Sequence, residues 1–142
     1  MPLEGPRNKM VFLDTNVIIR YITNDDPHKA DQCELLFKQV KEGKQKLFIS
    51  DLVIAETVWI LEGAYNFPKD RTTDILQKIL NTQNIECENK DLLLNAVSLY
   101  RLENIDYIDA YNASVMEYKK IEKIYSYDRD FDKLSDLKRL EP

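Results

Sequence analysis

Short segments rich in strand-forming residues recur along this chain, and stretches with helical periodicity separate them. The first, Val11-Phe12-Leu13, is continuously apolar, as the buried strands of parallel sheets are. Strands that alternate with helices predict a parallel sheet covered by helices on both faces. We therefore expect the α/β class, with a three-layer α/β/α architecture around a central parallel sheet. The expected strands cover residues 10–13, 47–50, 85–88, 123–127 and 137–140.

Helix-start signals stand between these strands. Asp26 precedes Pro27, which predicts an N-cap followed by proline at the first helical position. Asp51 and Asn89 are expected to cap two further helices. The expected helices cover residues 16–22, 27–43, 51–65, 70–80, 89–102 and 106–119.

Length and charge restrict the class of protein. We expect one domain over residues 1–142, in which the polar residues 1–9 form a loose leader. The net charge of −5 excludes a general basic footprint for nucleic acid, although local Lys and Arg side chains and a bound cation can still handle a phosphate. Cys33 and Cys87 lack the spacing of a zinc site or a disulfide framework. Because no apolar run reaches transmembrane length, we expect a cytoplasmic protein that does not enter the membrane.

Four acidic residues stand within or directly after apolar runs. Asp14 and Asp128 follow the first and fourth expected strands, and Asp109 lies among Tyr and Ile side chains. Glu56 interrupts a helix that is apolar nearly all round, so we expect it to point into a buried cleft between helices. Acids are almost never fully buried without a partner, and clustered carboxylates repel one another unless a cation neutralises them. A shared divalent cation is the simplest common explanation.

The expected fold supports this convergence, because sites in parallel α/β sheets lie beyond the carboxyl ends of the strands. Carboxylate oxygens suit Mg²⁺ or Mn²⁺ rather than zinc, and the lone His28 cannot supply a histidine-rich site. Simpler explanations exist for some of these acids. Asp128 could begin a turn, and Asp14 and Asp106 could cap helices.

A cation held by carboxylates has two main chemical uses. It can lower the pKa of a water that hydrolyses a phosphodiester. Alternatively, it can assist phosphoryl transfer to an Asp nucleophile, as in haloacid-dehalogenase phosphatases and response-regulator receivers. Those phosphatases need a second Asp two residues after the first, where this chain has Asn16 after Asp14. Receivers place their acids differently, so hydrolysis is favoured and a phosphatase-like enzyme is the alternative.

Four segments together resemble the motifs of PIN-domain nucleases. Their order and spacing agree with that family over residues 10–140, and although each motif alone is weak, the set is specific. The segments are Val11-Phe12-Leu13-Asp14-Thr15-Asn16-Val17, Ser50-Asp51-Leu52-Val53-Ile54-Ala55-Glu56, Asp106-Tyr107-Ile108-Asp109-Ala110 and Ser126-Tyr127-Asp128-Arg129-Asp130-Phe131.

The resemblance implies a PIN-like fold and a metal-dependent endoribonuclease, most often the VapC-type toxin of a type II toxin–antitoxin pair. It implies Mg²⁺ or Mn²⁺ as cofactor, with Asp14, Glu56, Asp109 and Asp128 as the catalytic, metal-binding acids. The third motif departs from the family pattern, because Tyr111-Asn112-Ala113-Ser114 is bulkier and more polar than usual. The expected supporting polar residues are Thr15, Asn16, Asp106, Ser126 and Asp130.

The substrate and partners follow as further expectations. Single-stranded RNA is favoured over duplex RNA because the acidic chain offers no long basic groove. Arg20, Lys69 and Arg129 are candidate phosphate contacts, although an ordinary solvated charge is the favoured interpretation of each. The resemblance also implies a homodimer and a small antitoxin protein. A stand-alone RNA-processing nuclease and a catalytically inactive RNA-binding module remain as alternatives.

Overall fold

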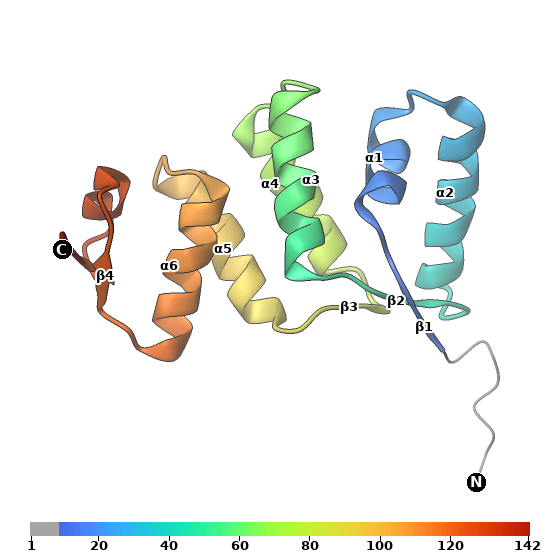
Figure 1. Ribbon diagram of the computed structural model, residues 1–142. Helices are drawn as coiled ribbons and strands as arrows, with labels where there is room; N and C mark the ends of the chain where they lie inside the picture. Colours follow the sequence, from blue (N-terminus) through green and yellow to red (C-terminus); the bar gives the residue numbers. More distant parts are fainter. Residues whose placement is uncertain (1–8) are drawn as a thin grey trace, which may run out of the picture.

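Two small parallel sheets, each flanked by helices, organise the chain (Figure 1). The structure is a computed structural model that describes residues 9–142; all but the last residue of the expected leader lie outside the described residues. The elements are β1 (Met10–Phe12), α1 (Thr15–Thr23), α2 (Pro27–Lys41), β2 (Lys46–Phe48), α3 (Asp51–Gly63), α4 (Lys69–Leu80), β3 (Ile85–Glu86), α5 (Lys90–Leu102), α6 (Tyr107–Lys119), β4 (Lys123–Tyr125), the 3₁₀ helix η2 (Arg129–Lys133) and β5 (Lys138–Leu140).

All strand pairs in residues 9–142 run parallel. The first sheet has the order β1-β2-β3, with Val11 opposite Leu47 and Leu47 opposite Ile85. The second sheet pairs β4 with β5, with Ile124 opposite Arg139. The predicted α/β class with parallel strands is confirmed, and the strands are divided between two sheets. β1 and β4 are therefore both edge strands, on separate sheets.

The helix boundaries follow local capping chemistry. Asp26 caps α2 by accepting a hydrogen bond from the N–H of Lys29 at 3.2 Å, and Pro27 is the first helical residue, as predicted. Asn89 caps α5 as expected. At α3 the predicted cap was wrong by one residue. Ser50, rather than Asp51, accepts from the Val53 N–H, because a serine hydroxyl directly before the helix reaches that donor at 3.2 Å.

The core lies among the helices and beneath β2. Tyr100 of α5 is fully buried, and its ring packs edge-on against Tyr107 of α6 at 5.8 Å between centroids. Lys69 of α4 lies over the Tyr100 ring, 4.4 Å from its centroid, and donates to the carbonyl oxygens of Tyr100 and Ile105. These contacts fix the segment that leads into α6, whose first turn carries Asp109.

The expectation that the first strand is buried was wrong. Met10, Val11 and Phe12 are all exposed, because β1 is the edge of its sheet and no described element covers its outer side. The apolar sequence of β1 therefore marks a strand whose far edge is open. None of the helices in the described part of the chain is long and apolar enough to cross a membrane.

Candidate metal centre

Three carboxylates gather where α6 meets the turn after β4. Asp109 lies in the first turn of α6, and Asp128 and Asp130 lie at the beginning of η2. One carboxylate oxygen from each residue lies within 4.8 Å of the others. Asp109 and Asp130 are half-buried and Asp128 is exposed. A single small cation can contact all three groups from solvent.

A short network shapes the turn that presents Asp128. The Ser126 hydroxyl accepts the Asp128 backbone N–H at 3.0 Å, and Asp128 Oδ1 accepts the Asp130 N–H at 2.9 Å. Arg139 donates from Nη1 to the carbonyl oxygen of Ser126 at 2.9 Å. Asp128 therefore does begin a turn, and that turn is also what directs its carboxylate toward Asp109.

Electrostatic repulsion acts on Asp109. Burial, followed by the negative charge of Asp128 and a hydrogen bond with it, raises the pKa of the Asp109 carboxyl to about 6. Asp106 and Asp130 raise it further. Lys133 partly neutralises the group, because its Nζ lies 3.0 Å from Asp130 Oδ1. The cluster thus carries excess negative charge that one lysine does not balance.

The donor set fits a hard divalent cation. All three clustered groups are carboxylates, which suit Mg²⁺ or Mn²⁺, and the cluster contains no thiol or imidazole ligand of the kind that zinc prefers. The neighbouring carboxylates that, after burial, raise the pKa of Asp109 support the same ion, since a cation would neutralise their charge. Asp109, Asp128 and Asp130 would hold the ion.

Asp14 and Glu56 lie outside this cluster. Asp14 stands at the N-cap of α1, and Figure 1 shows α1 and α2 at the opposite side of the molecule from β4. The expected convergence of four acids is therefore not present in this arrangement, because β1 and β4 belong to separate sheets. The Asp14 side chain makes no cap hydrogen bond, so capping does not occupy its carboxylate.

Glu56 corrects the prediction of a buried cleft. It is exposed on α3, on a stripe with Leu52, which is 81% exposed, and Trp59, which is 75% exposed. The opposite face of α3 supplies the buried residues Ile54, Val58 and Leu61. The helix is apolar on both faces but buried on only one. An apolar sequence all round a helix did not mean burial all round.

Comparison with known proteins identifies the family of this chain. Residues 11–137 match the family model described as PIN domain. The chain belongs to the PIN-domain family. Asp14, Glu56, Asp109 and Asp128 all fall within the matched span of this PIN domain.

This PIN domain is similar to proteins named as VapC ribonucleases or toxins. A VapC ribonuclease of Aquifex aeolicus (strain VF5) is 26% identical over 125 residues, which cover 88% of this chain and 92% of the relative. VapC20 of Mycobacterium tuberculosis, a sarcin-ricin loop cleaving toxin, is 20% identical, with a TM-score of 0.40 and coverage of 94% and 100%. VapBC2 of Rickettsia felis, bound to a fragment of its promoter DNA, is 19% identical, with a TM-score of 0.35 and coverage of 94% and 98%.

The expected supporting residues of this PIN domain divide into three groups. Ser126 and Asp130 belong to the Asp128 turn and the acid cluster. Asp106 stands at the N-cap of α6 without a side-chain cap bond, and its charge contributes to the raised pKa of Asp109. Thr15 and Asn16 lie in the first turn of α1, beside Asp14. The Thr15 Oγ1 is buried and has no hydrogen-bond partner within residues 9–142.

Two contributions were missed at the sequence level. Tyr111 donates from its hydroxyl to Asp51 Oδ2 at 2.6 Å, which ties α6 to α3. Lys133 contacts the acid cluster directly through Asp130. The unusual polarity of the Tyr111 segment was the available signal for the first contact. The i,i+3 spacing of Asp130 and Lys133 was the signal for the second.

The three candidate phosphate contacts also differ. The Lys69 ammonium donates to two backbone carbonyl oxygens and lies over the Tyr100 ring. It is therefore not available to a substrate. Arg129 is exposed at the start of η2. Arg20 lines a pocket between α1 and α2, described below.

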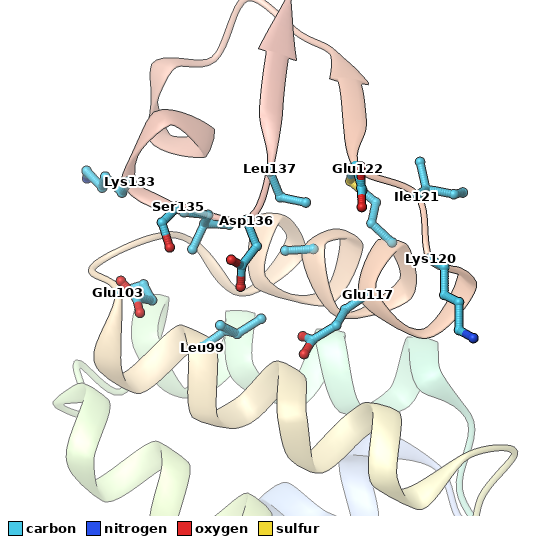
Figure 2. A pocket seen from close by; sticks show the side chains of 13 residues that line it. Leu99, Glu103, Glu117, Lys120, Ile121, Glu122, Lys133, Ser135, Asp136 and Leu137 are labelled. Carbon is cyan, nitrogen blue, oxygen red and sulfur yellow. The ribbon is translucent and has the colours of Figure 1, made fainter.

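A separate cavity of about 570 Å³ lies between α5, α6 and the C-terminal strands (Figure 2). Glu103, Glu117 and Asp136 surround it together with Lys120, over an apolar floor. It contains none of the four motif acids, and the α6 residues that line it lie in the C-terminal half of that helix, whereas Asp109 lies in the first turn. The cavity is therefore distinct from the acid cluster.

Proposed function

We propose that this PIN domain is an Mg²⁺- or Mn²⁺-dependent endoribonuclease that cleaves single-stranded RNA, of the VapC toxin kind. The observation that carries the proposal is the cluster of Asp109, Asp128 and Asp130, whose carboxylate oxygens lie within 4.8 Å of one another. The similarity to the VapC ribonuclease of Aquifex aeolicus over most of both chains supports the choice of RNA. Phosphodiester hydrolysis is the reaction for which such an acid set is suited.

The clustered acids share two tasks in the proposed reaction, cation binding and proton transfer. A bound divalent cation supplies a lowered water pKa and neutralises charge that develops on the phosphate. Asp109, Asp128 and Asp130 hold that cation, and the Ser126 hydroxyl fixes the turn that orients Asp128. A carboxylate of the same set accepts the proton of the attacking water. The water oxygen then bonds to phosphorus in line, the P–O bond on the opposite side breaks, and the departing ribose oxygen takes a proton from solvent.

Asp14 would join this set if β4 lay beside β1. β1 pairs with β2 on one side only, where the Leu13 N–H donates to the Phe48 carbonyl oxygen. Its other edge has no partner strand within the described residues, and its apolar side chains are exposed. β4 is also an edge strand, and all described pairs are parallel. In a parallel β1–β4 pair, the strand ends that carry Asp14 and Asp128 would meet at one edge of the sheet.

The reaction class can be tested on one preparation. Wild-type protein with Mn²⁺ should cleave a labelled single-stranded RNA and leave p-nitrophenyl phosphate intact. Asp14→Asn keeps the side-chain shape and loses the charge, so it should abolish cleavage without unfolding the protein. Turnover of p-nitrophenyl phosphate by wild type, without RNA cleavage, would favour the phosphatase alternative. Full RNA cleavage by Asp14→Asn would remove this acid from the site.

A toxin function implies partners as well as a substrate. Leu52 and Trp59 form an exposed apolar stripe on α3, and such surfaces in soluble proteins mark interaction sites. This supports a protein partner, either a second copy of the chain or a small antitoxin, in the cytoplasm where the RNA is found. Expression in a bacterial host should arrest growth, and Asp14→Asn should not. Co-expression of a small protein from the neighbouring reading frame should restore growth if it is the antitoxin.

A further inference from the structure

A pocket of about 460 Å³ lies between α1 and α2, beginning two residues after Asp14. We call it the α1–α2 pocket. Its volume falls within the range of about 300–1,000 Å³ that is usual for small-molecule sites. The structure brings residues of two helices to it, because α1 and α2 pack against each other as a hairpin (Figure 1). Its lining is Asn16, Val17, Arg20, Lys29, Gln32, Cys33 and Leu36.

Positive charge distinguishes this pocket from the rest of an acidic chain. Arg20 and Lys29 are its only charged lining residues within the described range, and neither forms an ion pair with any residue of that range. Burial raises the pKa of the Cys33 thiol, and the positive charge of Arg20, which lines the same pocket, opposes that effect. Two cations without a partner, facing one pocket in a chain of net charge −5, suit an anionic ligand.

The remaining lining suits a nucleobase. Asn16 and Gln32 offer amide groups that both donate and accept hydrogen bonds, as the edges of bases do. Val17 and Leu36 offer apolar surface on which the flat face of a base can lie. Proteins that bind single strands commonly combine cations along the backbone with aromatic side chains under the bases. This pocket has the cations, and two aliphatic side chains stand where aromatic rings are common.

We propose that the α1–α2 pocket binds one nucleotide of the single-stranded RNA that this domain cleaves. Arg20 and Lys29 contact its phosphate, and Asn16 and Gln32 contact its base. This inference rests on the proposed function and extends it, because it assigns residues that position the substrate rather than cleave it. Asn16, which lines the pocket, lies two residues after Asp14 in the chain.

Charge removal in the pocket tests the proposal. The double variant Arg20→Gln and Lys29→Gln is compared with Lys38→Gln, which removes an exposed charge of α2 outside the pocket. Binding of a fluorescent single-stranded RNA is measured in EDTA at several salt concentrations. The double variant should bind about tenfold more weakly, and the slope of log affinity against log salt concentration should fall by about 0.7, because both cations contact one phosphate. In cleavage assays with Mn²⁺, KM should rise and kcat should stay unchanged. The lost contacts bind the substrate and the transition state equally, so their loss weakens binding without slowing the chemical step.

The possible outcomes separate this inference from the proposed function. If wild type cleaves RNA and the double variant binds it equally well, the pocket assignment is wrong and the nuclease proposal stands. An equal loss in Lys38→Gln would show a general effect of charge and would also overturn the assignment. If wild type neither binds nor cleaves RNA, both proposals fail.

Cys33 provides a second readout that does not depend on charge. Bound RNA should slow alkylation of Cys33 by N-ethylmaleimide several-fold, because the thiol lines the pocket. Cys87 is the internal control, since it is also a half-buried free thiol but does not line the pocket. Protection of neither thiol, or equal protection of both, would contradict the proposed position of the RNA.

Discussion

The Tyr111 hydroxyl donates a 2.6 Å hydrogen bond to Oδ2 of Asp51. The contact joins the helix that carries Asp109 to the helix that carries Glu56. It raises the pKa of Tyr111 to about 12, chiefly because the hydrogen bond to the carboxylate would be lost on ionisation. Tyr111 belongs to the polar segment in which the third motif departs from its family, so this departure has a structural cause. Ser114 of the same segment donates to the Leu92 carbonyl of α5 at 2.7 Å.

Removal of this hydroxyl should destabilise the protein. Tyr111→Phe leaves the half-buried Asp51 carboxylate without its donor, and hydrogen bonds to charged groups contribute about 1.5–3 kcal/mol. Denaturant unfolding should show a loss of this size. Tyr118→Phe, which removes an exposed hydroxyl from the same helix, should change the free energy of unfolding by less than about 0.5 kcal/mol. Equal effects of the two variants would show that the contact contributes nothing.

The acid cluster predicts a pH dependence with a definite sign. The pKa of Asp109 is raised to about 6 in the folded protein, so the folded state binds more protons than the unfolded state between about pH 4 and pH 6. Without metal, stability should therefore fall as pH rises through this interval. Affinity for Mn²⁺ should weaken below about pH 6, because protons compete for the same carboxylate.

Titration by NMR of the Asp109 side chain in metal-free protein measures this pKa directly. Asp128→Asn removes the charge that acts most strongly on Asp109, so it should move the midpoint toward the ordinary range. A midpoint near 4 in the wild type would contradict the clustering of these acids.

Lys133 should compete with the metal for Asp130. Its ammonium lies 3.0 Å from Asp130 Oδ1 and also donates to the Asn104 carbonyl. Lys133→Gln should strengthen Mn²⁺ binding, by about fivefold at most, because exposed ion pairs are worth about 0–1 kcal/mol. Calorimetric titration compares it with Lys138→Gln, which changes an exposed lysine that makes no ion pair in the described residues. Unchanged or weaker affinity would show that Lys133 does not oppose the cation.

Glu56 should matter for cleavage and not for stability. Because it is exposed and makes no ion pair within residues 9–142, Glu56→Gln should change the free energy of unfolding by less than about 0.5 kcal/mol. RNA cleavage should fall at least about 100-fold if the carboxylate takes part in proton transfer or metal binding. Glu34→Gln, an exposed acid on α2, should have neither effect. Full cleavage by Glu56→Gln would exclude this residue from the reaction.

Local signals in the sequence were reliable for elements and caps. Asp26 with Pro27, and Asn89, placed two helix starts correctly because capping depends only on neighbouring atoms. The Asp128 turn was predictable for the same reason. Contacts across long sequence separations were not, and the 2.6 Å contact of Tyr111 with Asp51 is an example.

Burial was the property that the sequence predicted least well. The apolar runs around Glu56 and in β1 suggested enclosure, yet Trp59 and Phe12 are exposed. Sequence composition cannot distinguish an apolar surface that is buried within the fold from one that is covered only when another strand or a partner protein binds. Asp109 was the acid for which the argument from burial succeeded, because α6 packs on α5 and the C-terminal turn covers its first residues.

The position of bound Mn²⁺ tests the central claim most directly. Paramagnetic broadening of backbone amide signals falls steeply with distance from the ion, so substoichiometric Mn²⁺ reports which acids surround it. The account predicts strong broadening at Asp109, Asp128 and Asp130, and with them at Asp14 and Glu56 when RNA-cleaving conditions are used. Broadening that leaves Asp109 and Asp128 sharp, or that spreads evenly over the exposed acids, would contradict a metal centre at this cluster.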